Sequence, residues 1–435
     1  MRPLLRLTRQ GCRALECRRP GDVRIWLVLH VPDRLIEHMR IAQPGLIEVV
    51  FRGSLAGTPL DVEFSVPAAG ITAISGCGNT TVARCIGGLE RLPTGFCALD
   101  GEVWQDEDTF RPPHLRPIGY IFQRPILFSD LSVRRNLLYG ASKFEPTLIE
   151  VDAVLELLDL APLLDRSPSL ISDAERQRIV IGNALLSQPR LLVMEEPLAG
   201  LDRSGRRELL PFLERLHERL TLPIIYVSND MSDIERLADH LVMMKHGMVT
   251  AAAPLHVLQS DLALPLATRQ EAAVSLDAVV SGYDESYGLL VLVFKGARLL
   301  IPGKPLAPGT QQRLRIAACD VSISREDPRG SSILNVFPAR IKASVPLGGA
   351  EVTLLLALKT SGAGAQFLSR VTRRSFDVLE LKNGMDVFAQ VTGISLVPPS
   401  EELLRGLSTY SREEDPAPKR KGWLSPLTFE GGIAF

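Results

Sequence analysis

Residues 70–92 carry the pattern that most restricts what this chain can fold into. A short apolar run (GITAIS, 70–75) leads through the glycine-rich turn SGCGNTT into a segment whose apolar spacing suits a helix. In such a unit the glycines allow backbone N–H groups to close around phosphates at the helix N-terminus. Compared with GxxxxGKS or GxxxxGKT, the turn has Ala73 at the first glycine and Asn79 at the lysine, while Thr80 keeps the hydroxyl. On this loop alone, an ordinary glycine-rich turn remains the alternative to a phosphate-binding loop.

The surrounding segments predict an α/β sheet covered on both faces. Two alternating runs, 46–55 and 60–66, flank the turn AGTP and indicate an antiparallel hairpin. Buried strands and amphipathic helices then alternate along the chain, as they do in sheets with helical crossovers. The predicted helices are 155–165, 174–189 and 205–220, and the predicted buried strands are 189–197 and 223–230.

After about residue 265 the pattern changes to short apolar runs separated by Gly, Pro and charged pairs. Runs of this kind predict an all-β region made of small barrel-like modules. The runs are GLLVLVF, ARLLIP, LRIAA, VSIS, ARIKAS, EVTLLLAL and DVFAQVTGISLV.

Composition excludes several classes of protein. The 49 basic and 50 acidic side chains leave a net charge of −1, which gives no electrostatic case for binding nucleic acid. The 6 cysteines form no paired CxxC motifs, which indicates free thiols in a reducing compartment. No apolar run reaches the roughly 20 residues that span a bilayer, so a membrane role would be peripheral. Residues 1–45 are interpreted as an Arg-rich extension. It is either a targeting segment similar to a transit peptide, or most of it is not translated because translation starts at Met39.

Three further segments, 118–140, 171–202 and 224–247, follow in a characteristic order. They contain IGYIFQ, ISDAERQRIVIGNALLSQPRLLVMEEPLAGLD and IIYVSND, and together they resemble the ABC-transporter ATPases, within them the ATP-binding subunits of molybdate importers. The resemblance implies an α/β P-loop NTPase domain of ABC type followed by an all-β, OB-like regulatory domain similar to molybdate-binding proteins. The corresponding boundaries are a nucleotide-binding domain at 46–262, a regulatory domain at 265–398 and a mobile tail at 399–435.

The resemblance also implies roles for individual residues. Glu196 matches the base that orients the attacking water, Gln123 the loop glutamine that senses Mg²⁺, and Asn229 stands at the switch histidine. ATP would be held by Ser75, Gly76, Cys77, Gly78, Asn79, Thr80, Thr81, Ser172 and Asp202, and Mg²⁺ by Thr80, Gln123 and Glu195. Phosphoryl transfer requires an anion cradle, metal charge and an oriented water, and these residue types can supply all three.

The β-rich half resembles the oxyanion-binding regulatory domain of the same importers. An oxyanion site needs hydroxyl and N–H donors with little competing negative charge. The candidate donors are Ser331, Ser332, Asn335, Thr372 and Ser375. A purely structural barrel remains the alternative.

The family's partners follow from the resemblance. Two chains would dimerise across ATP at the cytoplasmic face of the inner membrane and drive two integral membrane permease subunits, which a periplasmic oxyanion-binding protein supplies with molybdate. Asn79, Asp173 and Asn229 depart from the family motifs, and they keep open a non-hydrolysing or weakly hydrolysing regulatory subunit. An importer ATPase for another solute, such as sulfate, is the third interpretation.

Overall fold

The computed structural model describes residues 5–7, 13–16, 26–28 and 43–397, except for 56, 142–147 and 360–364. In the predicted extension it describes a small antiparallel sheet that the sequence patterns did not indicate. Its strands are β1 (Leu5–Leu7), β2 (Arg13–Glu16) and β3 (Trp26–Val28). The predicted tail at 399–435 lies outside the described residues. Among the helices described, none is long and apolar enough to cross a membrane.

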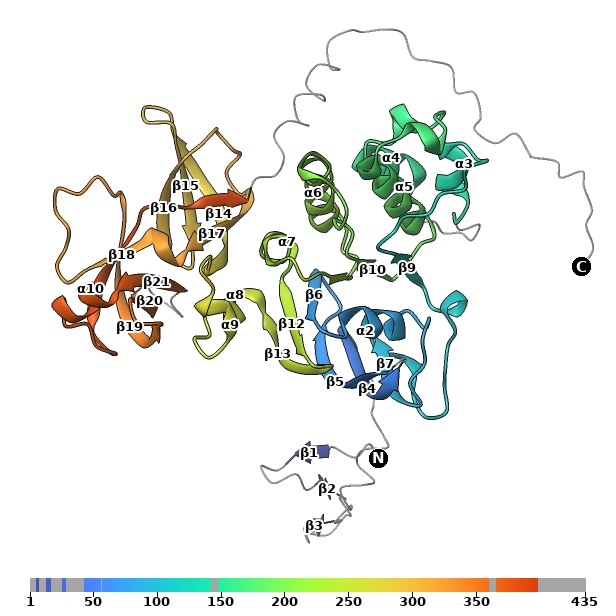
Figure 1. The fold of residues 1–435 in the computed structure, drawn as a ribbon, viewed down its shortest axis with the longest axis horizontal. Coiled ribbons are helices and arrows are strands. Elements are labelled where there is room, and N and C mark those ends of the chain that lie inside the picture. The colour runs from blue at the N-terminus through green and yellow to red at the C-terminus, as the bar shows by residue number, and fades with distance from the viewer. Residues whose placement is uncertain are drawn as a thin grey trace, which may run out of the picture. The chain divides into compact units, whose positions relative to one another are not determined.

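A ten-stranded mixed sheet forms the centre of the region that precedes residue 255 (Figure 1). Its strand order is β8-β7-β4-β5-β13-β12-β6-β11-β10-β9. The strands are β4 (Leu46–Leu55), β5 (Thr58–Pro67), β6 (Ile71–Gly76), β7 (Thr94–Leu99), β8 (Glu102–Gln105), β9 (Ile118–Ile121), β10 (Leu191–Glu195), β11 (Ile224–Val227), β12 (His240–Lys245) and β13 (Met248–Pro254).

The predicted hairpin is confirmed, and it joins this same sheet. Strands β4 and β5 pair antiparallel from Leu46 opposite Pro67 to Leu55 opposite Thr58. Every second residue of β5 from Leu60 to Val66 is buried, as the alternation predicted. These side chains pack with α2 and with the central strands in one apolar core.

Helices and short 3₁₀ turns connect the strands. They are α2 (Asn79–Ile86), α3 (Val133–Leu138), α4 (Val151–Leu157), α5 (Asp173–Leu186), α6 (Arg203–Arg219), α7 (Met231–Leu237), α8 (Leu255–Gln259) and α9 (Pro265–Thr268), with 3₁₀ turns at Pro113–Leu115, Ala161–Leu163 and Pro168–Leu170. The continuous helix predicted over 155–165 is wrong. Helix α4 ends at Leu157, Asp159 adopts a left-handed conformation (φ 48°), and Pro162 lies in a separate 3₁₀ turn that begins at Ala161.

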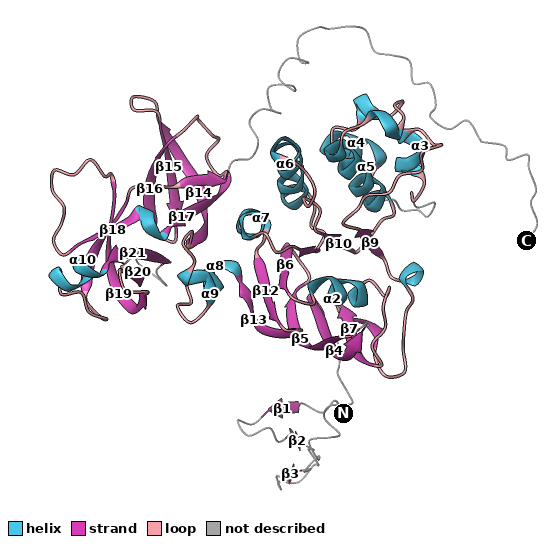
Figure 2. Ribbon diagram, in the orientation of Figure 1, coloured by secondary structure: helices cyan, strands magenta, loops and turns pink. Residues whose placement is uncertain are grey.

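The β-rich half is confirmed as two five-stranded sheets, which Figure 2 shows in magenta with few helices between them. One sheet has the order β16-β15-β14-β17-β23 and the other β18-β22-β19-β20-β21. The elements are β14 (Ala273–Asp284), β15 (Leu289–Phe294), β16 (Ala297–Pro302), β17 (Gln311–Ala317), a 3₁₀ turn (Ala318–Asp320), β18 (Val321–Ser324), β19 (Asn335–Leu347), β20 (Glu351–Leu358), β21 (Gln366–Thr372), α10 (Arg373–Val378), β22 (Asp386–Val391) and β23 (Ser395–Val397). Both sheets contribute to one apolar core, in which Phe294 and Phe337 meet edge to face at 6.2 Å.

Candidate functional site

The carboxyl ends of neighbouring parallel strands bring most of the predicted site residues to one edge of the sheet. Strands β6, β11, β10 and β9 lie side by side and run parallel. Gly76, Glu196 and Asn229 lie at or just after the ends of three of them, and Gln123 lies two residues beyond the fourth. Ligands of open α/β sheets bind outside such carboxyl ends, so this edge is the candidate nucleotide site.

The glycine-rich turn between β6 and α2 has a backbone that only glycine accommodates. Gly76 has φ 112°, and a Cβ there would lie 1.9 Å from the carbonyl oxygen of Met244. Gly78 has φ 97° and is the N-cap of α2. The predicted loop residues Ser75, Cys77 and Thr81 belong to the same turn and the start of α2. The phosphate-loop geometry therefore persists despite the altered motif.

Asn79, which replaces the expected lysine, folds back onto its own loop. The residue is only 6% exposed, and its Oδ1 accepts a hydrogen bond from the Thr80 amide at 2.7 Å. Its Nδ2 donates to the carbonyl of Ile74 at 3.5 Å and to Oδ1 of Asn229 at 3.4 Å. The amide of Thr80 is one of the first N–H groups of α2, which have no partner within the helix backbone and would otherwise be available to phosphate. A nucleotide phosphate must therefore displace Oδ1 of Asn79 from the Thr80 amide. It also lacks the lysine ammonium group that the motif normally provides at position 79.

Asn229 links the phosphate loop to Glu196. Its Oδ1 accepts from the Gly76 amide at 2.9 Å, and its own amide and Nδ2 donate to Oε1 of Glu196 at 3.2 and 3.4 Å. Glu196, the first residue after β10, adopts a left-handed conformation (φ 43°), so the backbone does not continue there as a strand. Burial raises the pKa of Glu196, although the hydrogen bond from Asn229 opposes this shift. A carboxylate with a raised pKa at the sheet edge is suited to act as a base.

Glu195 points to the other side of β10, toward two residues that the sequence did not suggest. Its Oε1 accepts from the Tyr120 hydroxyl at 2.5 Å and lies 3.8 Å from Nε of Arg84. Burial and this hydrogen bond raise the pKa of Tyr120 far above its usual range. Arg84 lies four residues after Thr80, so both occupy one face of α2 and this spacing could have identified it. Nothing in the sequence around Tyr120 signals its contact.

The predicted metal ligands match the chemistry of Mg²⁺. The hydroxyl of Thr80, the amide oxygen of Gln123 and the carboxylate of Glu195 are hard oxygen donors, which Mg²⁺ prefers. Mg²⁺ in nucleotide sites is held by one or two carboxylates together with phosphates and water, rather than by a cage of protein ligands. Within the ranges that the structure describes, no cluster of three or more His, Cys, Asp or Glu side chains could form such a cage.

Ser172 and Asp202 lie at helix starts rather than in the phosphate loop. Ser172 is the N-cap of α5 and exchanges hydrogen bonds with Glu175 in a capping box, with distances of 3.1 and 2.7 Å. Asp202 caps α6 by accepting from the amide of Gly205 at 2.7 Å. Asp173, which follows Ser172, is 80% exposed and lies 3.9 Å from Arg176, so part of its charge is balanced.

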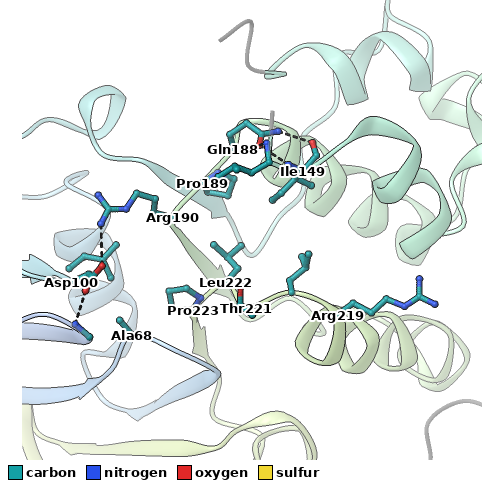
Figure 3. Close-up of a pocket in the computed structure, with 14 residues that line it drawn as sticks. Ala68, Asp100, Ile149, Gln188, Pro189, Arg190, Arg219, Thr221, Leu222 and Pro223 are labelled. Carbon is teal, nitrogen blue, oxygen red and sulfur yellow. Dashed lines mark hydrogen bonds and ion pairs between the residues drawn. The ribbon is translucent and has the colours of Figure 1, made fainter. Parts of the chain in front are cut away.

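A hollow of about 420 Å³ lies at the opposite edge of the sheet (Figure 3). Its lining residues Arg190 and Pro223 directly precede β10 and β11, so it faces the amino ends of the strands. Its polar side chains have protein partners: Arg190 lies 3.8 Å from Asp100, and the side chain of Gln188 accepts from and donates to the backbone of Ile149. This hollow is therefore not the phosphate site.

The structure does not bring the five predicted oxyanion donors together within one chain. Asn335 begins β19, whereas Thr372 pairs with Glu351, which in turn pairs with Leu347 at the far end of β19. The two ends are about 40 Å apart along the strand, at roughly 3.3 Å per residue.

The same donors also have local partners. Asn335 exchanges hydrogen bonds with the backbone of Leu300 at 2.8 and 2.9 Å, and Thr372 caps α10 by accepting from the amide of Ser375 at 3.0 Å. Ser331 accepts from the amide of Ile333, while the neighbouring Ser332 is exposed. Strand direction therefore separates these five candidate donors within one chain, and their role in binding an oxyanion stays a prediction.

Comparison with known proteins identifies both halves of the chain. Residues 60–199 match the ABC transporter family model, and residues 331–392 match the TOBE domain model. The chain is 63% identical to molybdenum import ATP-binding protein ModC 1 of Bradyrhizobium diazoefficiens, over 80% of this chain and 95% of that protein. It is 56% identical to the ModC protein of Rhodopseudomonas palustris strain HaA2, over 83% and 97%, and 45% identical to that of Rhodobacter capsulatus, over 82% and 99%. The chain therefore belongs to the molybdenum-import ATP-binding proteins of the ABC transporter family.

Proposed function

We propose that this protein binds ATP with Mg²⁺ and hydrolyses it to drive molybdate import through a membrane permease. One observation supports this most strongly. The phosphate loop, the switch position and the candidate base form a continuous hydrogen-bonded chain, from Gly76 through Asn229 to Glu196. This chain joins the groups that must act on the same γ-phosphate and the same attacking water.

Each part of the site has a distinct role in this proposal. Backbone N–H groups of residues 75–81 hold the β- and γ-phosphates at the start of α2. Thr80, Glu195 and Gln123 hold Mg²⁺, which supplies positive charge to the phosphate oxygens. Glu196 accepts the hydrogen bond of the attacking water and orients it in line with the γ-phosphate.

Asn229 takes the place of a switch histidine. Its amide group fixes the Glu196 carboxylate and can donate to a γ-phosphate oxygen, but it cannot become cationic. Together with Asn79, this leaves the phosphate site without the lysine cation of the family pattern and without a side chain at position 229 that can become cationic. Electrostatic stabilisation of the transferred phosphate is correspondingly weaker.

Assembly follows from the position of the remaining family motifs. We place Ser172 and Asp202 at the face that meets a second copy across ATP, at the cytoplasmic surface of the inner membrane. Apolar side chains on the segment 122–139, which contains Gln123, support docking to a permease: Phe122, Ile126, Phe128 and Tyr139 are 42%, 85%, 48% and 68% exposed. Exposed apolar groups gathered on one segment are typical of a protein-binding surface. A periplasmic oxyanion-binding protein would deliver molybdate to that permease.

The test is phosphate release from Mg-ATP by the purified chain, with nucleotide binding measured in parallel by calorimetry. Glu196→Gln should abolish release and leave binding intact, whereas the matched control Glu351→Gln, an exposed residue of β20, should behave as wild type. Release that survives Glu196→Gln would contradict the assignment of the base. Binding without release in the wild type would favour a regulatory subunit, an interpretation supported by the position of Asn79. Uptake of molybdate and of sulfate by cells that depend on this chain would identify the solute.

A further inference from the structure

Helix α7 connects the candidate γ-phosphate site to the β-rich half. It begins two residues after Asn229, with Asp230 as its N-cap, and ends at Leu237. Its seven residues extend about 10 Å, so a displacement of one end of this short helix also moves the other end. Arginines from other elements hold both ends.

At the amino end, Arg206 of α6 binds α7. Its guanidinium lies 2.7 Å from Oδ2 of Asp230 and 3.6 Å from Oδ2 of Asp233, which is 4% exposed. The amide of Arg206 donates to the carbonyl of Asp202 at 2.9 Å. The first turn of α7 is thereby tied to the first turn of α6.

At the carboxyl end, two arginines of β17 bind α7 and the residues that follow it. Arg313 donates to the carbonyls of Ala238 at 3.0 Å and Arg236 at 3.4 Å, and to Oδ1 of Asp239 at 2.7 Å. Arg315 donates to Oε2 of Glu235 at 2.9 Å. A cation that donates to the last carbonyls of a helix satisfies free acceptors and complements the helix dipole.

The same contact reaches the phosphate loop by a second route. Asp239 also accepts from the amide of Ile71 at 2.8 Å, and Ile71 is the first residue of β6, the strand that leads into Gly76. Arg313 therefore contacts the end of α7 and, through Asp239, the start of β6. The other ends of these two elements lie next to the hydrogen bond between Gly76 and Asn229.

We infer that Arg313 and Arg315 are positioning residues for Asn229 and Glu196, acting through α7. The β-rich half thus sets the geometry of the γ-phosphate site through two guanidinium groups, in addition to any ligand it binds. This inference rests on the proposed function, because it assigns Asn229 and Glu196 to hydrolysis.

The first experiment compares Arg313→Ala, Arg313→Lys and Arg315→Ala in the full-length protein. The matched control is Arg340→Ala, which removes an ion pair to Asp386 (2.7 Å) within the β-rich half. Arg313→Ala and Arg315→Ala should lower kcat roughly tenfold with KM for ATP within about twofold, since Asn229 and Glu196 face the reacting phosphate rather than the adenosine. Arg313→Lys should recover part of kcat, and Arg340→Ala should leave it unchanged.

Amide hydrogen exchange gives a readout that does not depend on hydrolysis. Exchange over residues 228–238 should rise in Arg313→Ala and Arg315→Ala, but not in Arg340→Ala, without nucleotide present. Equal exchange in all variants would overturn the inference even if hydrolysis were undetectable. Absence of hydrolysis in the wild type together with the expected exchange pattern would count against the proposed function alone.

A double-mutant cycle separates positioning from loss of stability. Adding Arg313→Ala to Asn229→Ala should lower kcat no further, because Arg313 reaches Glu196 only through Asn229, which is already absent. If the two losses multiply, or if kcat in every variant follows the fraction of folded protein, Arg313 is only a structural residue.

Discussion

Restoring a lysine at position 79 should tighten ATP binding and at the same time weaken the free protein. In the structure, Asn79 is buried and its side chain occupies the amide of Thr80 at 2.7 Å. Asn79→Lys removes this internal acceptor and supplies a cation where β- and γ-phosphates would lie. Both changes favour the nucleotide-bound state over the free state.

The size of each effect follows from these contacts. A hydrogen bond to a charged group contributes about 1.5–3 kcal/mol, so the dissociation constant for Mg-ATP should fall roughly 10- to 100-fold. Without nucleotide, Asn79→Lys loses the bonds to Thr80 and Ile74 and leaves an ammonium group in a nearly closed loop. We expect the free energy of unfolding to fall by about 1 kcal/mol, which lowers Tm by roughly 2–4 °C.

Calorimetric titration with Mg-ATP and thermal unfolding without nucleotide measure the two effects separately. Asn79→Met is the matched control. Methionine is similar in length to lysine, and this variant loses the same internal hydrogen bonds as Asn79→Lys but adds no charge. The methionine variant should lose stability without the lysine variant's gain in affinity. Equal affinity of the lysine and methionine variants would refute the argument that a missing cation weakens this site.

Three further predictions concern other parts of the site. Gly76→Ala should lose nucleotide binding, because its Cβ would lie 1.9 Å from the Met244 carbonyl oxygen; Gly200→Ala, with φ 81° but open space around it, should cost only about 1–2 kcal/mol and leave calorimetric binding intact. Glu196→Gln should trap bound nucleotide, seen as Mg-ATP that co-elutes with the protein in gel filtration while the wild type releases product. Burial tends to raise the pKa of Asp239, but the hydrogen bond from His217 and the charge of Arg313 outweigh it and hold that pKa well below its usual range. Because this stabilisation is complete above the unfolded-state pKa and is lost as pH falls, Asp239→Asn should cost about 2 kcal/mol at pH 7 and less below about pH 4, measured by urea unfolding.

Much of the fold could be predicted because its signals are local. The alternation in 60–66 predicts one buried face of a strand, and the structure confirms it. The glycines between β6 and α2 have the positive φ values that a phosphate loop requires. Serine and aspartate that directly precede helices become N-caps, as at Ser172 and Asp202. Each of these outcomes depends on residues a few positions apart.

Local patterns failed where the chain offered two interpretations. The apolar spacing over 155–165 is compatible with one helix, but Asp159 and Pro162 interrupt it. The oxyanion donors were grouped because of their chemistry, and strand direction places Asn335 and Thr372 at opposite ends of the sheet. Residue type alone does not determine which end of a strand a side chain occupies.

The sequence by itself determined the local elements and the residue types at the nucleotide site. Only the tertiary structure decided which of these residues meet. Asn229 reaches the Gly76 amide across 153 residues, and Arg313 reaches Asp239 across 74. Such contacts depend on the order of parallel strands in the sheet and on where β17 lies relative to the end of α7. Neither leaves a periodic pattern in the sequence, because each is fixed by the burial of the whole core rather than by neighbouring residues.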